Sequence, residues 1–454
     1  MEDRYSSQKF SMVLPVLFYE YLAISITRSI LPAMLVGAFG KWTYAMVGII
    51  ETVKGLLAFF ACPLFGKVSD KIGRKYCLLA TVIGTTFPIC VMAFTSNMWI
   101  YVVCVGLSGL FSATFPLTFA YIADCVSPHK RAPAYGLALA TLGLSFTIGP
   151  PMGGYIDTKF STRSVFVLSL VLVVIDVLYI LFLLPETVQP DQAKAGSFKK
   201  KLNTALEYLP HTWDLSNTFR IFGGDGFMRH IAYIVFLYYT TVWAVVSTLM
   251  VYVTRHLDFS PITVGWLLCF YGVSTMFSEG VLVRLIVPWL GELNSMRIGL
   301  LCFAIQSVML AFSSSPTLIF MSVAFSMISN LVYPSISSLV SKSVEEAEQG
   351  EAQGALNGIK ALTEGFGPLV FGSLMALFEG GSLLPGAPYL VAAFGTVFAF
   401  LHTFELPSDY EATIPTYSFP SMNYKIPSKE KQGLLAMDSS DEECEDLASS
   451  SVRL

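Results

Sequence analysis

Charged residues are scarce in this sequence of 454 residues, of which only 13% are Asp, Glu, Lys or Arg. A soluble protein carries about 25% charged residues, so the low share excludes a surface that is water-exposed throughout. The net charge of −4 argues against a nucleic-acid partner, which would require a basic face. In contrast, 54% of the residues are hydrophobic and the mean hydropathy is +0.63, which predicts a lipid-facing surface.

Several chemical signatures are also missing. The sequence contains no spacing typical of metal ligands, no glycine loop that cradles a phosphate and no nucleophile beside a base. We therefore expect no enzyme, no cofactor and no metal site. The eight cysteines lie inside apolar segments, at their ends or in the tail, so they indicate no disulfide framework. No cleavable signal peptide is expected, because the first apolar run is long enough to stay in the bilayer.

Twelve apolar runs are long enough to span a membrane, which takes roughly 20 mainly apolar residues. The first six cover about 12–36, 45–65, 76–94, 98–124, 133–156 and 164–185, and the second six cover about 230–253, 263–288, 298–314, 316–341, 355–377 and 387–405. We predict an all-α, multi-pass membrane protein with twelve transmembrane helices. Its parts are a six-helix bundle over 1–187, a cytosolic linker over 188–228, a second bundle over 229–405 and a disordered tail over 406–454.

One stretch of the sequence occurs twice, 218 residues apart. The first copy, residues 116–154, recurs with its special residues in register: Pro116 with Pro334, Gly136 with Gly354, Gly149-Pro150 with Gly367-Pro368, and Gly154 with Gly372. This repeat predicts two pseudo-symmetric halves. In membrane carriers, parallel repeats of this kind place the substrate site between the halves, near the bilayer midplane.

The basic residues between the runs predict the orientation. If the N-terminus is cytosolic, the cytosolic segments hold twenty Lys and Arg residues and the opposite segments hold four. This strong bias predicts that both termini are cytosolic. In the linker, apolar residues recur at helical spacing beside three lysines, so an amphipathic helix lies there either on the membrane surface or in solvent.

The segment between the second and third runs combines glycines, an acid and basic residues. We expect a tight cytosolic turn at Gly66 and Gly73 and a gate in which charges latch one bundle to another. The gate residues are Gly66, Asp70, Gly73, Arg74, Asp124 and Arg131. The segment resembles the signature of the major facilitator superfamily, which implies alternating access by rocking of two six-helix halves. The second-half counterpart, residues 290–297, lacks the Asp and is a degenerate copy.

The fifth run carries Gly149, Pro150, Gly153 and Gly154 after Ser145. Small residues let helices approach closely and proline bends a helix, so we expect a packing motif. It resembles the motif of antiporters in the superfamily, and this resemblance implies antiport.

A closer resemblance is to the hippocampus-abundant-transcript branch, itself similar to tetracycline exporters. The segments that carry it are Val53–Leu57, Phe119–Asp124, Ala134–Leu137 and Pro185–Thr187. In those exporters an arginine in the fourth helix is tied to proton coupling. This sequence has Cys104 at that position, so it lacks that route.

Charged residues inside the runs are costly in lipid and are therefore functional or paired. Glu20 is our candidate for proton coupling, because a buried carboxyl group can exchange a proton near neutral pH. Its alternative role is a structural pair with Lys54 or Arg28. Lys54 either pairs with Glu51 or faces the cavity as a cation. The predicted cavity residues are Thr27, Lys54, Tyr238, Tyr239, Trp243 and Glu279.

These observations predict a monomeric secondary transporter that carries a small organic solute across the lipid bilayer, with protons as a candidate coupling ion. A protein of another class remains as the alternative: a transporter-shaped receptor or cargo-sorting scaffold without solute flux. The missing arginine and the degenerate second signature favour this alternative.

The tail contains Glu430 four residues before the pair Leu434-Leu435, followed by serines and an acidic run. This resembles an acidic dileucine sorting signal that clathrin adaptors bind. We expect residence in endosomal or lysosomal membranes, with the plasma membrane or Golgi as alternatives.

Changing Leu434 and Leu435 to alanine should move the protein to the plasma membrane, because an adaptor pocket needs both leucines. Charge reversal at Glu430 should give a weaker shift. Fluorescence imaging of the tagged protein in cells tests this, with Leu447→Ala in the same tail as control. An unchanged location of the double variant would show that the tail is inert for sorting.

Overall fold

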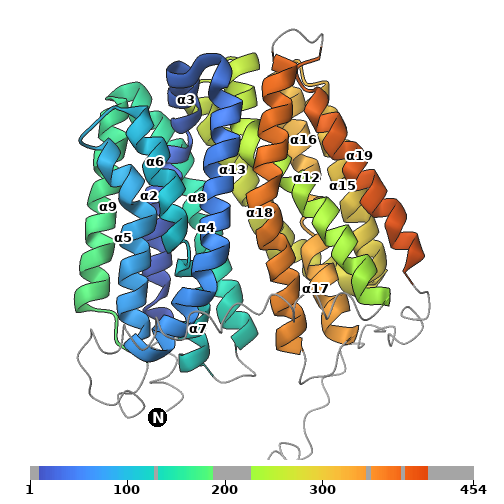
Figure 1. Cartoon of the computed structure of the whole chain (residues 1–454), viewed down its shortest axis with the longest axis horizontal. Helices are drawn as coiled ribbons and strands as arrows, with labels where there is room; N and C mark the ends of the chain where they lie inside the picture. Colours follow the sequence, from blue (N-terminus) through green and yellow to red (C-terminus); the bar gives the residue numbers. More distant parts are fainter. Residues whose placement is uncertain (1–9, 127–130, 188–225, 344–348, 380–383, 407–454) are drawn as a thin grey trace, which may run out of the picture. The chain divides into compact units, whose positions relative to one another are not determined.

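The computed structural model describes residues 10–126, 131–187, 226–343, 349–379 and 384–406 (Figure 1). Within these residues every regular element is a helix. Ten of the helices described are long and apolar enough to cross a membrane. The predicted linker helix and the tail signal of Glu430, Leu434 and Leu435 lie outside the described residues.

The first six runs form helices as predicted. The first run is broken at Ser29 and Ile30. The helices are α2 (Leu14–Arg28), α3 (Leu31–Phe39), α4 (Thr43–Ile72), α5 (Arg74–Met92), α6 (Met98–Ser108), α7 (Thr114–Cys125), α8 (Arg131–Lys159) and α9 (Thr162–Phe182).

The second six runs are helical as well, and the first of them begins at Gly226, within the range assigned to the linker. The helices are α12 (Gly226–His256), α13 (Pro261–Phe277), the π-helical turn η6 (Ser278–Leu282), α14 (Val283–Leu290), α15 (Glu292–Ala311), α16 (Pro316–Ser329), α17 (Val332–Ser343), α18 (Gln349–Glu379), α19 (Ala387–His402) and the 3-10 turn η7 (Thr403–Glu405).

The internal repeat extends beyond residues 116–154. Five helix starts are related by the same shift of 218 positions: 43 and 261, 74 and 292, 98 and 316, 114 and 332, and 131 and 349. The breaks between α6 and α7 and between α16 and α17 also correspond. The two halves therefore share helix lengths and turn positions as well as a few special residues.

The contacts between the halves follow the repeat. Helix α8 packs against α13, and the equivalent pair is α18 against α4. Glycines allow these helices to approach closely. A Cβ built on Gly55 would lie 2.9 Å from the Cα of Gly365, and a Cβ built on Gly372 would lie 2.8 Å from the Cα of Gly48. Backbone contact at this distance is the small-residue packing typical of membrane helices.

We define the inner face as the side where α4 ends and α5 begins, which the basic residues predict to be cytosolic. The opposite side is the outer face. The glycine contacts lie in the outer parts of α4, α8, α13 and α18, so the structure holds the halves together on the outer side.

The motif of the fifth run is divided between two neighbours. Added Cβ atoms at Gly149 and Gly153 would overlap α2, at Ser25 and at the carbonyl oxygen of Ile26. A Cβ at Gly154 would instead lie 2.6 Å from the Cα of Ile262 in α13, in the other half. Pro150 belongs to the same contact, because its carbonyl oxygen lies 2.5 Å from a Cβ built on Gly265. The motif thus packs α8 against both its own half and the opposite one.

Gly153→Ala should lower the thermal unfolding midpoint in detergent, because the new methyl group would overlap the carbonyl oxygen of Ile26. Overpacking costs about 1–3 kcal/mol, which typically exceeds the ~1 kcal/mol that alanine gains over glycine in a helix. The matched control is Gly136→Ala in the same helix, where an added Cβ meets nothing within 4 Å. Equal midpoints for the two variants would contradict this packing role.

Candidate functional site

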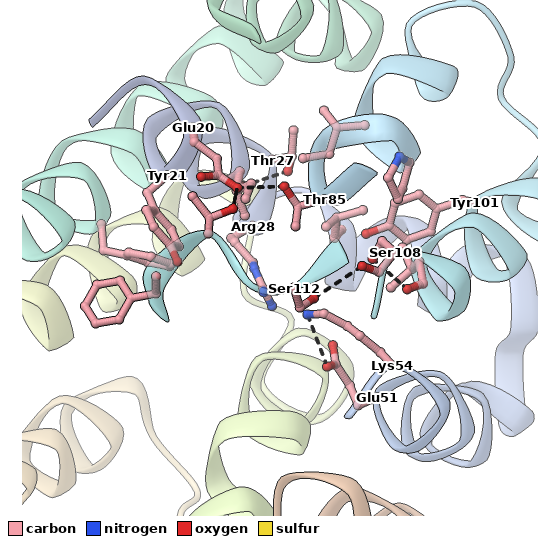
Figure 2. Close-up of a pocket in the computed structure, with 18 of the residues that line it drawn as sticks. Glu20, Tyr21, Thr27, Arg28, Glu51, Lys54, Thr85, Tyr101, Ser108 and Ser112 are labelled. Atoms are coloured by element: carbon pink, nitrogen blue, oxygen red, sulfur yellow. Dashed lines mark hydrogen bonds and ion pairs between the residues drawn. The ribbon is translucent and has the colours of Figure 1, made fainter. Parts of the chain in front are cut away.

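A cavity of about 410 Å³ lies among the helices of the first half (Figure 2). Helices α2 to α8 line it, and Glu364 of α18 closes it from the second half. Its charged lining residues are Glu20, Arg28, Glu51, Lys54 and Glu364. Ionisable groups grouped at mid-span are expected to mark a substrate or ion pathway.

Glu20 is held by hydroxyl groups from two other helices. Its Oε1 accepts hydrogen bonds from Thr85 Oγ1 of α5 at 2.6 Å and from Thr114 Oγ1 of α7 at 3.0 Å. The side chain is 1% exposed, and Oε2 has no hydrogen-bond partner among the described residues. Glu20 forms no ion pair with Lys54, so the alternative of a Glu20–Lys54 pair does not hold in this structure. Because burial disfavours the ionised form and Oε2 has no partner among the described residues, this carboxyl group can hold a proton.

Arg28 lies at the end of α2, where the first run breaks, yet its side chain is exposed to the cavity. Its guanidinium forms no ion pair or hydrogen bond with any residue that the structure describes. Figure 2 shows it pointing into the space between Tyr21 and Ser112. From the sequence, Arg28 was expected only as a structural partner of Glu20, although an arginine at mid-span is itself a signal of function.

Lys54 combines the two roles that the sequence left open. Its Nζ lies 3.7 Å from Glu51 Oε2, and both side chains line the cavity. The lysine is thus a cavity residue whose charge is largely neutralised within its own helix.

Of the remaining predicted cavity residues, one lines the cavity and four lie elsewhere. Thr27 lines the cavity, and its hydroxyl donates to the carbonyl of Ile24. The other four, Tyr238, Tyr239, Trp243 and Glu279, do not line it. Tyr238 donates to the carbonyl oxygen of Ser329 within the second half, and Trp243 packs beside Gly367. Glu279 is exposed on η6.

Lys360 forms a separate aromatic site in the second half. Glu364, four residues later in the same helix, is at a spacing that allows an ion pair. The Nζ of Lys360 lies instead over the rings of Tyr239 and Tyr333, at 5.1 and 4.5 Å from their centroids. Cation–π contact with two rings competes with the helical pair for the ammonium group.

The turn at the inner face is tighter than predicted. Helix α4 continues to Ile72, so Gly66 and Asp70 lie within the helix and not in a loop. Gly73 alone makes the turn, with φ 117° and ψ 149°, a conformation that side chains disfavour. The side chains of two predicted gate residues, Asp70 and Arg131, lie outside what the structure describes.

The first half carries a charge cluster at the inner face. Arg74 Nε lies 3.0 Å from Asp124 Oδ2, and Nη1 of Arg74 donates to Ser69 Oγ. Glu186 accepts hydrogen bonds from the backbone N–H groups of Arg74 and Lys75 at 2.8 and 3.2 Å. The carboxylate of Glu186 therefore caps the N-terminus of α5, where the helix dipole favours negative charge. This capping role of Glu186 was not predicted from the sequence.

The second half repeats this cluster with the charges exchanged. The shift of 218 relates Arg74 to Glu292 and Asp124 to Lys342, and these partners also form an ion pair. Gly291, equivalent to Gly73, makes the same turn with φ 79° and ψ 162°. The second copy lacks the acid of the signature, since Pro288 stands at the position equivalent to Asp70, but it retains an ion pair and the glycine turn. A pair of opposite charges keeps its attraction when both signs are reversed, so the fold tolerates the exchange.

The outer face has its own polar connection between the halves. Arg255, at the end of α12, is paired with Glu379 at the end of α18 and donates to the carbonyl oxygen of Gly40 in the first half.

Two helical halves with a shared plan, and a cavity in the first half with charges at mid-span, define a membrane carrier. The chain belongs to the Major Facilitator Superfamily, whose sequence pattern matches residues 13–368 and, in a second match, residues 231–417. The resemblance of the inner-face segment is thereby confirmed, and the protein is a transporter of this superfamily, not an enzyme.

The individual relatives agree with this assignment. The chain is 29% identical to "Hippocampus abundant transcript 1 protein" of Homo sapiens, over 92% of this chain and 90% of the relative. It is 28% identical to "Hippocampus abundant transcript-like protein 1" of Homo sapiens, over 88% of this chain and 80% of the relative. It is 24% identical to "Tetracycline resistance protein, class E" of Escherichia coli, over 80% of this chain and 87% of the relative.

Solved structures show the same fold at lower identity. The human organic anion transporter MFSD10 (TETRAN) is 20% identical with a TM-score of 0.62, covering 88% of this chain and 99% of that one. The peptide transporter POT in complex with sulfate is 12% identical with a TM-score of 0.67, covering 89% and 95%.

Glu292→Lys should lower the thermal unfolding midpoint, because it places two cations together at Lys342. We expect a loss on the order of 1–2 kcal/mol, since half of Lys342 is exposed and solvent screens the pair. Adding Lys342→Glu should restore most of the loss, because the exchanged pair then has the order of charges found at Arg74 and Asp124. A double variant no more stable than Glu292→Lys alone would rule out the pair as the cause.

Proposed function

We propose that this transporter carries a small organic anion by alternating access. The observation that carries the proposal is Arg28, an exposed cation at mid-span with no ion pair to a described residue. A guanidinium offers two parallel donors to a carboxylate or phosphate, so it binds such groups with defined geometry.

Three of the four other charged residues of the cavity already have partners, and the fourth, Glu364, closes it from the second half. Lys54 is already neutralised by Glu51 at 3.7 Å, and Glu20 is occupied by two hydroxyl groups. Arg28 is therefore the cavity cation that has no ion pair to a described residue. A volume of about 410 Å³ falls in the range of small-molecule sites.

Alternating access is supported by the inner and outer connections. The structure joins the halves on the outer side, through glycine packing and through Arg255 with Gly40. The two inner ion pairs are each formed within one half. Opening the outer side would require the Arg255 contact and the glycine contacts to separate together.

We further propose that Glu20 couples transport to protons. It lines the same cavity as Arg28 and has one oxygen without a partner among the described residues. Cys104, at the position of the exporters' arginine, is half-buried in α6 and offers no charge, so the coupling route differs from that of the exporters. The packing motif of α8 is consistent with exchange of a solute for protons, the antiport that its resemblance suggests.

Residence in endosomal or lysosomal membranes is a proposal that rests on the tail signal of Glu430, Leu434 and Leu435, with adaptor binding as the mechanism.

The receptor or scaffold without flux remains the second candidate function. It is favoured by the loss of the exporters' arginine at Cys104.

Purified protein in proteoliposomes should take up carboxylates from an equimolar mixture of small mono- and dicarboxylic acids, measured by mass spectrometry, and exclude a matched mixture of amines. Arg28→Gln should reduce this uptake at least about tenfold, the cost of one charge-assisted contact. The control is Arg284→Gln, an exposed arginine of α14 outside the cavity. Uptake of amines would refute the anion class, and no flux of any solute would favour the scaffold.

Glu20→Gln should abolish the dependence of uptake on an imposed pH gradient while leaving carboxylate exchange measurable, because glutamine keeps the hydrogen-bonding shape and cannot release a proton. Uptake driven equally by the gradient in both proteins would contradict a proton role for Glu20.

A further inference from the structure

Two histidines and a glutamate meet at the inner end of the second half. His230 lies in the first turns of α12, His402 is the last residue of α19, and Glu405 belongs to η7. Figure 1 shows the inner ends of α12 and α19 side by side, and the two helices are in contact. The sequence predicted no metal site, because 172 positions separate the histidines and no spacing pattern connects them.

The three side chains converge closely. His230 Nδ1 lies 2.9 Å from His402 Nε2 and 3.5 Å from Glu405 Oε2. His402 Nδ1 lies 2.9 Å from the same carboxylate oxygen. One ligand atom from each residue can be chosen so that all three lie within 4.8 Å of one another.

We propose that His230, His402 and Glu405 form a binding site for a divalent transition metal of the Zn²⁺ class. Two imidazole nitrogens and a carboxylate oxygen suit zinc, and they are poor ligands for the oxygen-preferring Mg²⁺ and Ca²⁺. Three protein ligands leave the fourth tetrahedral position for water or another donor.

The two facing histidine nitrogens need little movement, whereas the carboxylate has to shift, because it contacts the other nitrogen of His402. Zinc–nitrogen bonds of 2.0–2.1 Å in a tetrahedron place two nitrogens about 3.3 Å apart, compared with 2.9 Å between the facing histidine nitrogens. The histidine side chains are 25% and 18% exposed, whereas that of Glu405 is 60% exposed. The imidazoles are therefore held by their helices, while the carboxylate can adjust and solvent supplies an entry path.

The neighbouring side chains fix the site in place. The ring of Tyr233 meets that of His402 edge to face, with centroids 5.8 Å apart. Arg297 holds η7 through Thr403, with Nε 3.1 Å from Oγ1 and Nη2 3.2 Å from the carbonyl oxygen. A bound metal would join the first turns of α12 to the turn that follows α19, which are the two ends of the second half.

This site lies outside the cavity of the first half and shares no residue with it. A test of zinc binding is therefore independent of the proposed substrate.

The experiment uses the full-length protein in detergent, stripped with EDTA and desalted. After incubation with Zn²⁺, and separately with Mg²⁺, the bound metal is measured by inductively coupled plasma mass spectrometry. We expect about one zinc per chain above the detergent blank, no retained magnesium, and a visible absorption band when Co²⁺ replaces Zn²⁺.

Glu405→Gln and the double change of His230 and His402 to alanine should each weaken zinc binding at least about tenfold, since even the loss of an outer partner costs 10–100-fold. His256→Gln, at the other end of α12, is the matched histidine control and should bind like the wild type. Zinc should raise the thermal midpoint of the wild type and of this control only.

Glu405→Gln keeps the test valid if the double variant fails to fold. Zinc stoichiometry that is zero in the wild type, or unchanged in the Glu405→Gln and double variants, would overturn the proposal.

Discussion

The structure depends on direct backbone contact between the halves at glycines. Gly55 meets Gly365 and Gly48 meets Gly372 so closely that no side chain fits between them. Because lipid supplies no hydrophobic drive for helix association, dispersion between well-fitted surfaces holds such helices together. These contacts bring Glu364 of the second half to a cavity otherwise formed by the first. A bulkier residue at any of these glycines would separate the walls of the site.

A second constraint is the cost of charge in the bilayer, and the chain meets it in several ways. Glu20 is surrounded by hydroxyl groups, Lys54 pairs with Glu51 in its own helix, and Lys360 lies over aromatic rings. Arg28 has none of these arrangements with the residues that the structure describes, and it faces the cavity. This difference between charges with partners and a charge without one is the basis for proposing an anionic substrate.

The two inner ion pairs show how a repeat can persist physically after its sequence has diverged. Arg74 with Asp124 and Glu292 with Lys342 occupy equivalent positions with opposite signs. When the two halves are aligned residue by residue, the residue types at these positions differ, so the motif looks lost. The electrostatic attraction and the glycine turns at Gly73 and Gly291 are nevertheless retained.

The sequence by itself determined the membrane class, the twelve helical runs and the doubled plan, because hydropathy and glycine–proline spacing are local properties of the chain. It also selected Glu20, Thr27 and Lys54, since charged or polar residues stand out within apolar runs. Only the tertiary structure decided which charges are partnered, because partners such as Thr85 and Thr114 for Glu20 come from other helices. The meeting of His230 with His402 likewise arises from packing between the first and last helices of one half. No local pattern encodes such contacts, since they depend on how distant segments are brought together.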